Sequence, residues 1–350
     1  MISFYPGPSQ LDDAVEIALK KAVSTSMLSE NHRSKRFEIL YKTTIQTIRK
    51  KLSLPKSYTV LFASSATECW EIIAQSLIGN RNSLHLVNGA FGQKWFTYTQ
   101  LLTNHAQVLN FGVDEYVPVS NFPQSPVICF THNETSNGTY WPESALTQLR
   151  KNYPESLLVA DATSSLGGIR INFEQADVWF ASAQKCLGLP AGLAVLFLSP
   201  RAVDVARTLN HHSHYNALPS MLAMQAKLQT THTPNVLGIF LLNEILSKRK
   251  HIRLIDKQTR TRMHRWISYF KKSKTYTPYV KNSSVQSPTV LCIHSNAANV
   301  RALKKLTTKN GYTLGEGYGA LKENTFRIAN FPALKQKHIK GLQKYLLNLI

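Results

Sequence analysis

The chain has 350 residues, of which 43% are hydrophobic and 17% charged, so its composition excludes a disordered protein and allows one large and one smaller domain. The first residues do not resemble a secretory signal, and no apolar stretch approaches the roughly 20 residues of a membrane helix. The chain has 41 Lys and Arg against 20 Asp and Glu, which gives a net charge of +21. Its four cysteines are scattered and form no CxxC pair, a pattern that predicts free thiols in a reducing cytoplasm.

Up to about residue 200 the chain repeats one pattern, in which a short apolar run precedes a polar turn and, in most cases, a helix-like segment. Continuous apolar runs are typical of strands buried on both faces, and strands that alternate with helices predict a largely parallel sheet. The runs lie at 59–62, 84–87, 126–130, 156–160, 177–181 and 191–199. The sequence therefore predicts an α/β fold with a large domain over residues 10–245.

Polar or small residues follow most of these runs directly, at Ser65–Thr67, Asn88–Phe91, His132–Thr135, Asp161 and Gln184–Lys185. Ligands of open parallel sheets bind beyond the carboxyl ends of the strands. We therefore expect these residues to meet at one edge of the sheet.

The composition changes after about residue 245. A basic amphipathic helix is predicted over 248–272, a strand over 289–295, a helix over 296–309 and a strand over 325–330, before a terminal helix that reaches Ile350. This alternation predicts a smaller α/β domain formed by residues 1–9 and 246–350.

The positive charge occurs in short runs along the chain rather than in one tail. Aromatic residues do not alternate with these runs in the way typical of proteins that stack on single-stranded nucleic acids. Net charge affects steering and solubility and does not by itself indicate a partner. We interpret the runs as solvated helix faces and expect neither a nucleic-acid nor a membrane partner. They lie at 20–21, 49–51, 248–253, 271–274, 304–305 and 335–340.

Seven segments occur in the order and at the spacing found in class V aminotransferases, which the chain resembles over nearly its whole length. They are SSATECWE (64–71), NGAFGQKW (88–95), THNETSNGTYWP (131–142), VADATSSLGG (159–168), SAQKCLGLPAG (182–192), THTPN (231–235) and TFRIAN (325–330). The resemblance implies the pyridoxal-phosphate (PLP) transferase fold of type I, with a mostly parallel seven-stranded sheet, and a homodimer with shared active sites. It also implies transamination between a small L-amino acid and a 2-oxo acid such as 2-oxoglutarate. Within the class the chain is most similar to phosphoserine aminotransferases, which implies a role in serine biosynthesis.

Two residues carry the chemistry that this resemblance implies. PLP needs an amine that forms an imine and then moves a proton, and Lys185 lies after a buried strand where it matches the Schiff-base lysine. Asp161 matches the carboxylate that pairs with the pyridine nitrogen of the cofactor. From the residues alone, Lys185 could equally be a surface charge, and Asp161 could be a turn residue or a helix cap.

Further cofactor contacts follow from the same motifs. The amides of Ala66 and Thr67 start a helix that could bind the phosphate, although Ser65 and Glu68 also fit an ordinary capping box. The resemblance implies that Phe91 lies against the pyridine ring and that Thr135 binds its phenolic oxygen. It also implies phosphate contacts from Gln184, His232 and Thr233, the last from a partner subunit.

Substrate recognition requires a donor that can bind a carboxylate through two hydrogen bonds, which is typical of arginine. Arg327 matches the carboxylate-binding arginine of the family, although an arginine in a strand could also face solvent. His32 and Arg33 resemble a segment that reaches across the dimer toward the distal end of the substrate.

Three alternatives remain open. Thr67 stands where phosphoserine aminotransferases commonly have a second arginine, which favours an alanine– or serine–glyoxylate or –pyruvate aminotransferase. A desulfurase-like or lyase member of the same fold would need a reactive cysteine in a mobile loop, and none of the four cysteines lies in a recognisable one. A non-catalytic basic binding protein would not need Lys185, Asp161 and Arg327.

Two further segments carry weaker predictions. The segment GEGYG (315–319) predicts a flexible turn near the active site, and we expect no metal site at His211, His212 and His214.

Overall fold

The structure is a computed structural model that describes residues 1–346, and two β-sheets organise it. One sheet has the strand order β2-β10-β9-β8-β5-β3-β4, a second has the order β1-β13-β14-β12-β11, and β6 and β7 form a small hairpin. The strands are β1 (Ile2–Phe4), β2 (Thr59–Ala63), β3 (Ser83–Val87), β4 (Ala106–Asn110), β5 (Val127–Thr131), β6 (Asn133–Glu134), β7 (Thr139–Tyr140), β8 (Leu157–Asp161), β9 (Val178–Ser182), β10 (Ala194–Leu198), β11 (Thr277–Pro278), β12 (Val290–His294), β13 (Tyr312–Glu316) and β14 (Thr325–Ala329).

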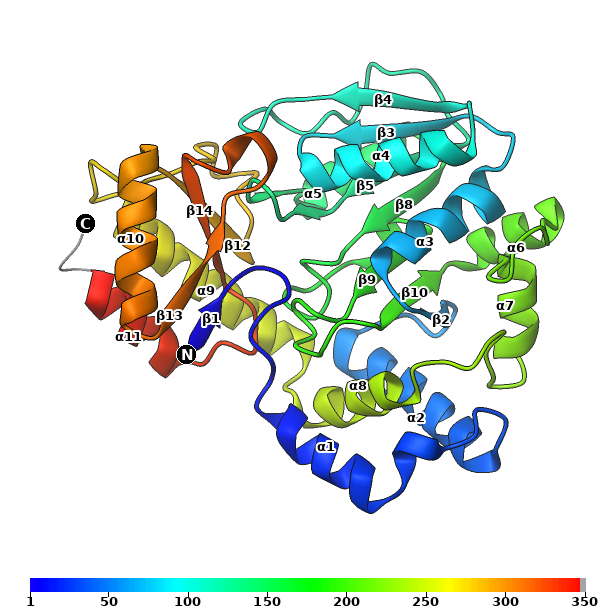
Figure 1. Cartoon of the computed structure of the whole chain (residues 1–350). Helices are drawn as coiled ribbons and strands as arrows, with labels where there is room; N and C mark the ends of the chain where they lie inside the picture. The colour runs from blue at the N-terminus through cyan, green and yellow to red at the C-terminus, as the bar shows by residue number, and fades with distance from the viewer. Residues whose placement is uncertain (347–350) are drawn as a thin grey trace.

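Helices connect most of the strands and cover both sheets (Figure 1). No helix within residues 1–346 is long and apolar enough to cross a membrane. The α-helices are α1 (Ala14–Ser24), α2 (Lys35–Leu52), α3 (Ala66–Ile73), α4 (Ala90–Leu102), α5 (Glu143–Asn152), α6 (Pro200–Leu209), α7 (Leu218–Gln225), α8 (Val236–Lys248), α9 (Ile252–Phe270), α10 (Ala297–Lys309) and α11 (Gln336–Leu346). The terminal helix was expected to reach Ile350, and residues 347–350 lie outside the described part of the chain.

The seven-stranded sheet confirms the predicted fold class. Its strands are parallel except for β10, which pairs antiparallel with both β2 and β9. Asp161, at the end of β8, lies opposite Thr131 of β5 and Phe180 of β9. The carboxyl ends of the parallel strands therefore share one edge, as expected from the sequence.

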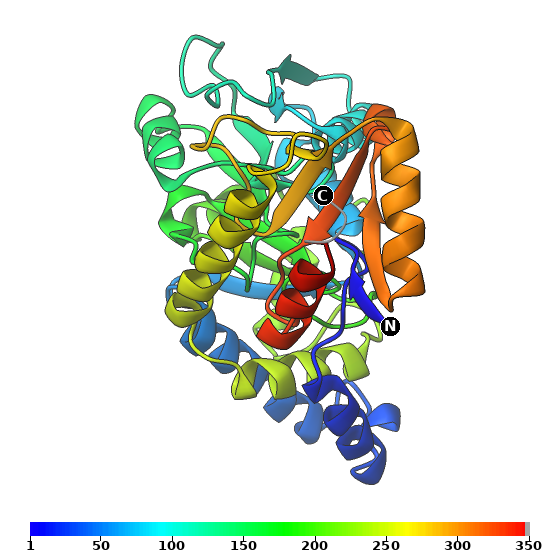
Figure 2. The same ribbon diagram turned by 90° about the vertical axis from the view of Figure 1, so that its left-hand side faces the viewer.

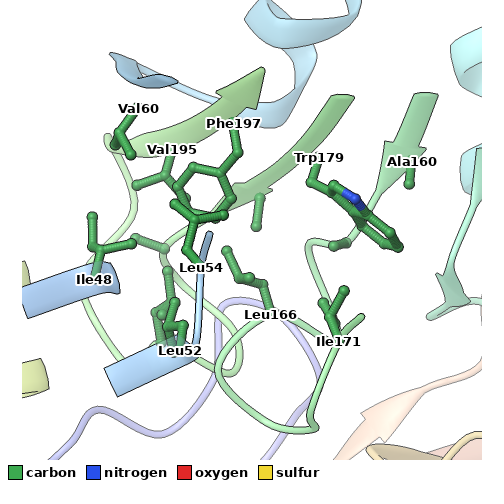
Figure 3. Packing of buried hydrophobic residues seen from close by; sticks show 14 of the residues in the cluster. Ile48, Leu52, Leu54, Val60, Ala160, Leu166, Ile171, Trp179, Val195 and Phe197 are labelled. Carbon is green, nitrogen blue, oxygen red and sulfur yellow. The ribbon is translucent and has the colours of Figure 1, made fainter. Parts of the chain in front are cut away.

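Apolar packing on both faces of this sheet explains why its strands are continuous apolar runs. Helices α1, α2, α5 and α8 pack on one face and α3, α4, α6 and α7 on the other. Figure 3 shows part of the first core, where Ile48 and Leu52 of α2 lie near Val195 and Phe197 of β10. The side chains of β3, β5, β8, β9 and β10 are all buried, so water contacts neither face of these strands.

The five-stranded sheet joins the two ends of the chain. Its strand β1 pairs in parallel with β13, and β14 lies between β13 and β12 in antiparallel register. Trp266 and Phe270 of α9 pack with Phe326 of β14 in a separate apolar core. Helices α9, α10 and α11 lie together over one face of this sheet (Figure 2).

Candidate active site

A cavity of about 200 Å³ lies at the carboxyl edge of the seven-stranded sheet. The segments that follow β2, β5, β8 and β9 surround it, together with the start of α4 and the N-terminal segment at Gly7 and Pro8. Of the residues proposed for the site, it brings together Ala66, Thr67, Phe91, Thr135, Asp161, Gln184 and Lys185.

Lys185 extends into this cavity from the turn after β9. Its Nζ atom donates a hydrogen bond of 2.7 Å to Oγ1 of Thr135 and lies 4.8 Å from the centroid of the Phe91 ring. Burial lowers the pKa of Lys185 to about 8, although Asp161 and Glu134 act in the opposite direction. The amine therefore loses its proton more readily than an exposed lysine does.

Asp161 is a buried residue of the same cavity. Its Oδ2 atom accepts a hydrogen bond of 3.1 Å from the indole Nε1 of Trp70, and its Oδ1 atom accepts one of 2.9 Å from the amide of Thr163. Burial raises the pKa of Asp161, and its hydrogen bonds with Thr163 and Trp70 and the charge of Lys185 oppose that increase. A cationic group bound in the cavity would stabilise the charged carboxylate further.

The first turn of α3 lines the cavity. Ser65 is the N-cap, and its hydroxyl accepts a hydrogen bond of 3.0 Å from the amide of Glu68. The Glu68 carboxylate accepts from the amide of Ser64 rather than from that of Ser65, so only half of the capping box considered above forms. The hydroxyl of Ser182 accepts from the amide of Ala66 at 2.6 Å. The start of a helix attracts anions, so this turn, with the hydroxyl of Thr67 beside it, can bind a phosphate.

Phe91 forms one wall of the cavity, and two residues outside the predicted set hold it there. Its amide and that of Gly92 donate to Oε2 of Glu134 at 3.1 and 3.0 Å, at the N-terminus of α4. The ring stacks on Tyr318, with 4.9 Å between the ring centroids. Tyr318 follows β13, so the predicted GEGYG turn is only partly correct, because Gly315 and Glu316 belong to that strand.

Arg327 lies on β14, next to Thr135. It is buried, and it donates from Nη1 to the carbonyl of Thr135 at 2.9 Å and from Nε to the carbonyl of Glu316 at 2.6 Å. The solvent-facing alternative is therefore wrong. Arg327 does not itself line the Lys185 cavity, and the hydrogen bonds found within residues 1–346 use its Nε and Nη1 atoms, so its contact with a substrate carboxylate stays a prediction.

Four predicted residues lie away from the Lys185 cavity of their own chain. Arg33 is exposed, and its Nη1 atom donates to Gln229 at 2.8 Å. Burial lowers the pKa of His32, and the nearby charges of Arg33 and His232 lower it further. Because such an effect requires proximity, His232 lies near His32. Thr233 is exposed and directly follows His232 in the chain. One chain therefore forms two clusters, one around Lys185 and one around His32.

The first cluster fits PLP. It offers a buried amine, a carboxylate, a helix N-terminus and an aromatic wall, which match the aldehyde, ring nitrogen, phosphate and ring of the cofactor. The buried hydroxyl of Thr131 also lines the cavity and has no hydrogen-bond partner within the described chain. No group of three or more His, Cys, Asp or Glu side chains in residues 1–346 is placed to hold a metal ion.

Sequence reasoning missed Trp70, Glu134 and Tyr318 as parts of this site. A tryptophan on an amphipathic helix resembles a core residue, and Trp70 does stack on Trp95. Glu134 lies inside a segment that was expected to line the site, but nothing in the sequence indicates that it caps α4. Only the preference for a carboxylate at a helix N-terminus could have suggested that role.

Comparison with known proteins places these observations in a family. The family described as aminotransferase class-V matches residues 3–321. A phosphoserine aminotransferase of Rhodococcus opacus (strain B4) is 28% identical over 350 residues, which cover 96% of this chain and 90% of that protein.

Solved structures agree with this relationship. A phosphoserine aminotransferase from Cytophaga hutchinsonii superposes with a TM-score of 0.94 at 32% identity, and the match covers 100% of this chain and 99% of that one. An alanine–glyoxylate aminotransferase from Nostoc sp. superposes with a TM-score of 0.84 at 17% identity, over 99% and 94% of the two chains, and shares the fold.

Proposed function

This chain belongs to the class-V aminotransferases, which use pyridoxal phosphate, and we propose that it moves an amino group between phosphoserine and a 2-oxo acid such as 2-oxoglutarate. The observation that carries the choice of substrate is the whole-chain likeness, at 32% identity, to a phosphoserine aminotransferase. We also propose residues 10–245 as the cofactor-binding domain and residues 1–9 with 246–350 as the small domain, since β1 pairs with β13.

In this proposal Lys185 and Asp161 are the catalytic residues. PLP supplies a carbon that takes up the amino group and a ring that withdraws electrons from the substrate's α-carbon. Lys185 Nζ first holds the cofactor and then, as a free amine with a lowered pKa, takes the α-proton. Asp161 stabilises positive charge on the ring nitrogen, and Trp70 and the amide of Thr163 hold its carboxylate in place.

The remaining contacts divide between binding the phosphate and binding the ring. The first turn of α3 binds the phosphate through Thr67, with the neighbouring Gln184, and the amide of Ala66 joins them if it leaves the hydroxyl of Ser182. Phe91 packs on the pyridine face, and Thr135 donates to the phenolic oxygen once the lysine amine has moved from it.

Substrate binding requires a second chain. Arg327 binds the α-carboxylate through Nη2, and the lining of the cavity within residues 1–346 contains no cation other than Lys185. A distal phosphate therefore needs positive charge from elsewhere. We propose that Arg33 and His32 of the partner subunit supply it in a homodimer, and that His232 and Thr233 of the partner subunit reach the cofactor phosphate.

One observation favours a second candidate function. Thr67 lies in the cavity where phosphoserine aminotransferases commonly have a further arginine that would strengthen the binding of the substrate phosphate. The site of a single chain therefore has less positive charge than binding of phosphoserine favours. Alanine– or serine–glyoxylate or –pyruvate transamination needs no distal cation and is the alternative.

The test is to compare kcat/KM for phosphoserine, serine and alanine in a buffer without phosphate. A charge-assisted contact contributes about 1.5–3 kcal/mol, so phosphoserine should be preferred by roughly tenfold or more. Arg33→Ala should remove most of this preference, whereas Lys35→Ala, an exposed change at the start of α2, should keep it. A preference for alanine or serine in the unaltered protein would establish the second candidate instead.

We also propose a cytoplasmic location. The four cysteines are free and buried, as in proteins that work in a reducing compartment.

A further inference from the structure

Although basic runs occur along the whole chain, the net positive charge is concentrated in its C-terminal part, so the interpretation of the charge as spread along the chain is wrong. Residues 246–350 contain 22 of the 41 Lys and Arg but only 3 of the 20 Asp and Glu, so they carry +19 of the net +21. The first 245 residues, with 19 basic and 17 acidic side chains, are close to neutral. The basic runs that are scattered along the sequence therefore belong mostly to one structural unit.

The fold brings these runs onto one face. Helices α9, α10 and α11 pack on the same apolar core of the five-stranded sheet, and in Figure 2 they lie on the side that faces the viewer, with α9 and α10 at its two edges and α11 between them. Asp256 is the single acidic residue in the three helices. This surface, together with the residues that directly flank the helices (Lys271, Lys272 and Lys335), is called the basic face, and it lies on the other side of the molecule from α6 and α7 (Figure 1).

Few cations of the basic face are neutralised within the chain. Arg260 pairs with Asp256, Arg301 with Glu323, Lys304 with Glu316 and Lys335 with Asp13. The exposed cations that form no ion pair within residues 1–346 are Arg253, Lys257, Arg265, Lys271, Lys272, Lys305, Lys309, Lys337, Lys340 and Lys344. Like charges at this density repel one another, so a bound polyanion would relieve the repulsion.

A groove of about 440 Å³ crosses the basic face between α9 and α11. It is lined by the cations Arg265 and Lys272 and by the polar side chains of His264, Ser268 and Gln343. The ring of Tyr269 also lines it, and the hydroxyl of Tyr269 is buried without a hydrogen-bond partner among the described residues. The groove thus combines positive charge, hydrogen-bonding groups and an aromatic ring.

We propose that the basic face binds the phosphate backbone of a single-stranded nucleic acid, with the strand in the groove between α9 and α11. A cationic groove with an aromatic side chain is the combination that single-stranded nucleic acids recognise. A protein partner would need apolar anchors and few lysines, and the large hydrophobic side chains exposed on these three helices are Leu254 and Leu306. A flat anionic bilayer could contact the rim but could not enter the groove.

The expectation from the sequence was that the basic runs are solvated helix faces without a nucleic-acid partner, and the experiment below decides between the two. Nucleic-acid binding does not depend on the substrate proposed above, because the basic face shares no residue with the Lys185 cavity. Failure of one proposal would therefore leave the other intact.

The test is the affinity of the full-length protein for a fluorescein-labelled oligouridine RNA of about 20 nucleotides, long enough to span several phosphate contacts, measured by anisotropy between about 50 and 200 mM salt. The triple variant Arg265→Glu, Lys272→Glu, Lys340→Glu should weaken binding by about tenfold or more at about 100 mM salt, because it removes two cations that line the groove and an exposed third one on α11. The slope of log affinity against log salt should fall by about 0.7 for each RNA phosphate that the variant no longer neutralises.

The matched control is Lys42→Glu, Lys56→Glu, Lys151→Glu, which changes the net charge equally at exposed, unpaired lysines of the first 245 residues. It should bind RNA within about twofold of the unaltered protein, and both triple variants should keep transaminase activity, which shows that they fold. Equal losses in the two variants would overturn the proposal, because net charge would then explain binding. No RNA binding, or binding only to vesicles of phosphatidylglycerol and phosphatidylcholine, would also overturn it.

Discussion

At the scale of single residues, the lowered pKa of Lys185 predicts how the rate of PLP attachment depends on pH. Because burial favours the neutral amine, and a neutral amine is what attacks an aldehyde, the rate of covalent PLP uptake by the apoprotein should rise by about tenfold per pH unit below pH 8. Above about pH 8 the rate should level off, whereas an ordinary lysine would continue to gain up to about pH 10.

The measurement is the growth of the visible absorbance that PLP acquires when it is attached to a lysine. Lys185→Ala should develop no such band, and borohydride reduction of the unaltered protein should label Lys185 in a peptide map. A rate that still rises well above about pH 9, as for an ordinary lysine, or a label on another lysine, would contradict the assignment.

Substitution of Asp161 should separate cofactor binding from catalysis. Asp161→Asn should retain PLP but lose about 10²–10³ in turnover, because a neutral amide cannot stabilise the charged ring nitrogen. Steady-state kinetics would measure this loss, with Asp204→Asn on the exposed side of α6 as the control. Unchanged turnover would show that Asp161 only caps the turn at Thr163.

At the scale of elements, Glu134 connects a β-hairpin to the start of α4. Its buried carboxylate accepts hydrogen bonds from the amides of Phe91, Gly92 and Ser136 and from the Ser136 hydroxyl. The Cβ atom of any larger residue at Gly89 would come within 2.3 Å of Glu134 Cγ, so the helix start and the carboxylate fit closely. Glu134 is thus a positioning residue that acts through Phe91.

Glu134→Gln should lower the free energy of unfolding by about 1.5–3 kcal/mol, because the amide loses the charge and directs N–H groups at backbone donors. It should also weaken PLP binding, since the Phe91 wall moves with the helix start. Denaturant unfolding and PLP titration would measure the two effects. Glu143→Gln, at the exposed start of α5, should change stability by less than about 0.5 kcal/mol, and equal effects in the two variants would refute the capping role.

At the scale of the whole molecule, the separation of the Lys185 and His32 clusters predicts complementation between chains. Lys185→Ala and Arg33→Ala proteins should each be weakly active with phosphoserine, and their mixture should recover activity. In a mixed dimer one site has both Lys185 and the partner's Arg33, so random exchange should restore up to about a quarter of the normal sites. Activity after subunit exchange measures this, and a fully active monomer or no recovery would count against shared sites.

Much of the fold could be predicted because its strands are buried on both faces. Such strands leave continuous apolar runs, and the runs at 59–62, 84–87 and 126–130 became β2, β3 and β5. Strand β4 was missed since it lies at the sheet edge, where its side chains are half-exposed and its sequence, AQVLN, carries no continuous apolar run. Strand β1 has only three residues, too few to produce a pattern.

The sequence by itself determined the sheet through its apolar runs and the family through the seven matching segments. It also predicted the positions of Lys185 and Asp161, because Asp161 ends a buried strand and Lys185 lies three residues after one, at the edge where parallel topology collects side chains. Only the tertiary structure decided that Trp70 holds Asp161, that Tyr318 stacks on Phe91, and that the basic helices α9, α10 and α11 pack on one side of the five-stranded sheet. The physical reason is the range of the contacts involved. The hydrophobic pattern of a helix or strand indicates which of its sides is buried. The arrangements named above depend instead on contacts between elements that meet only after the chain has folded.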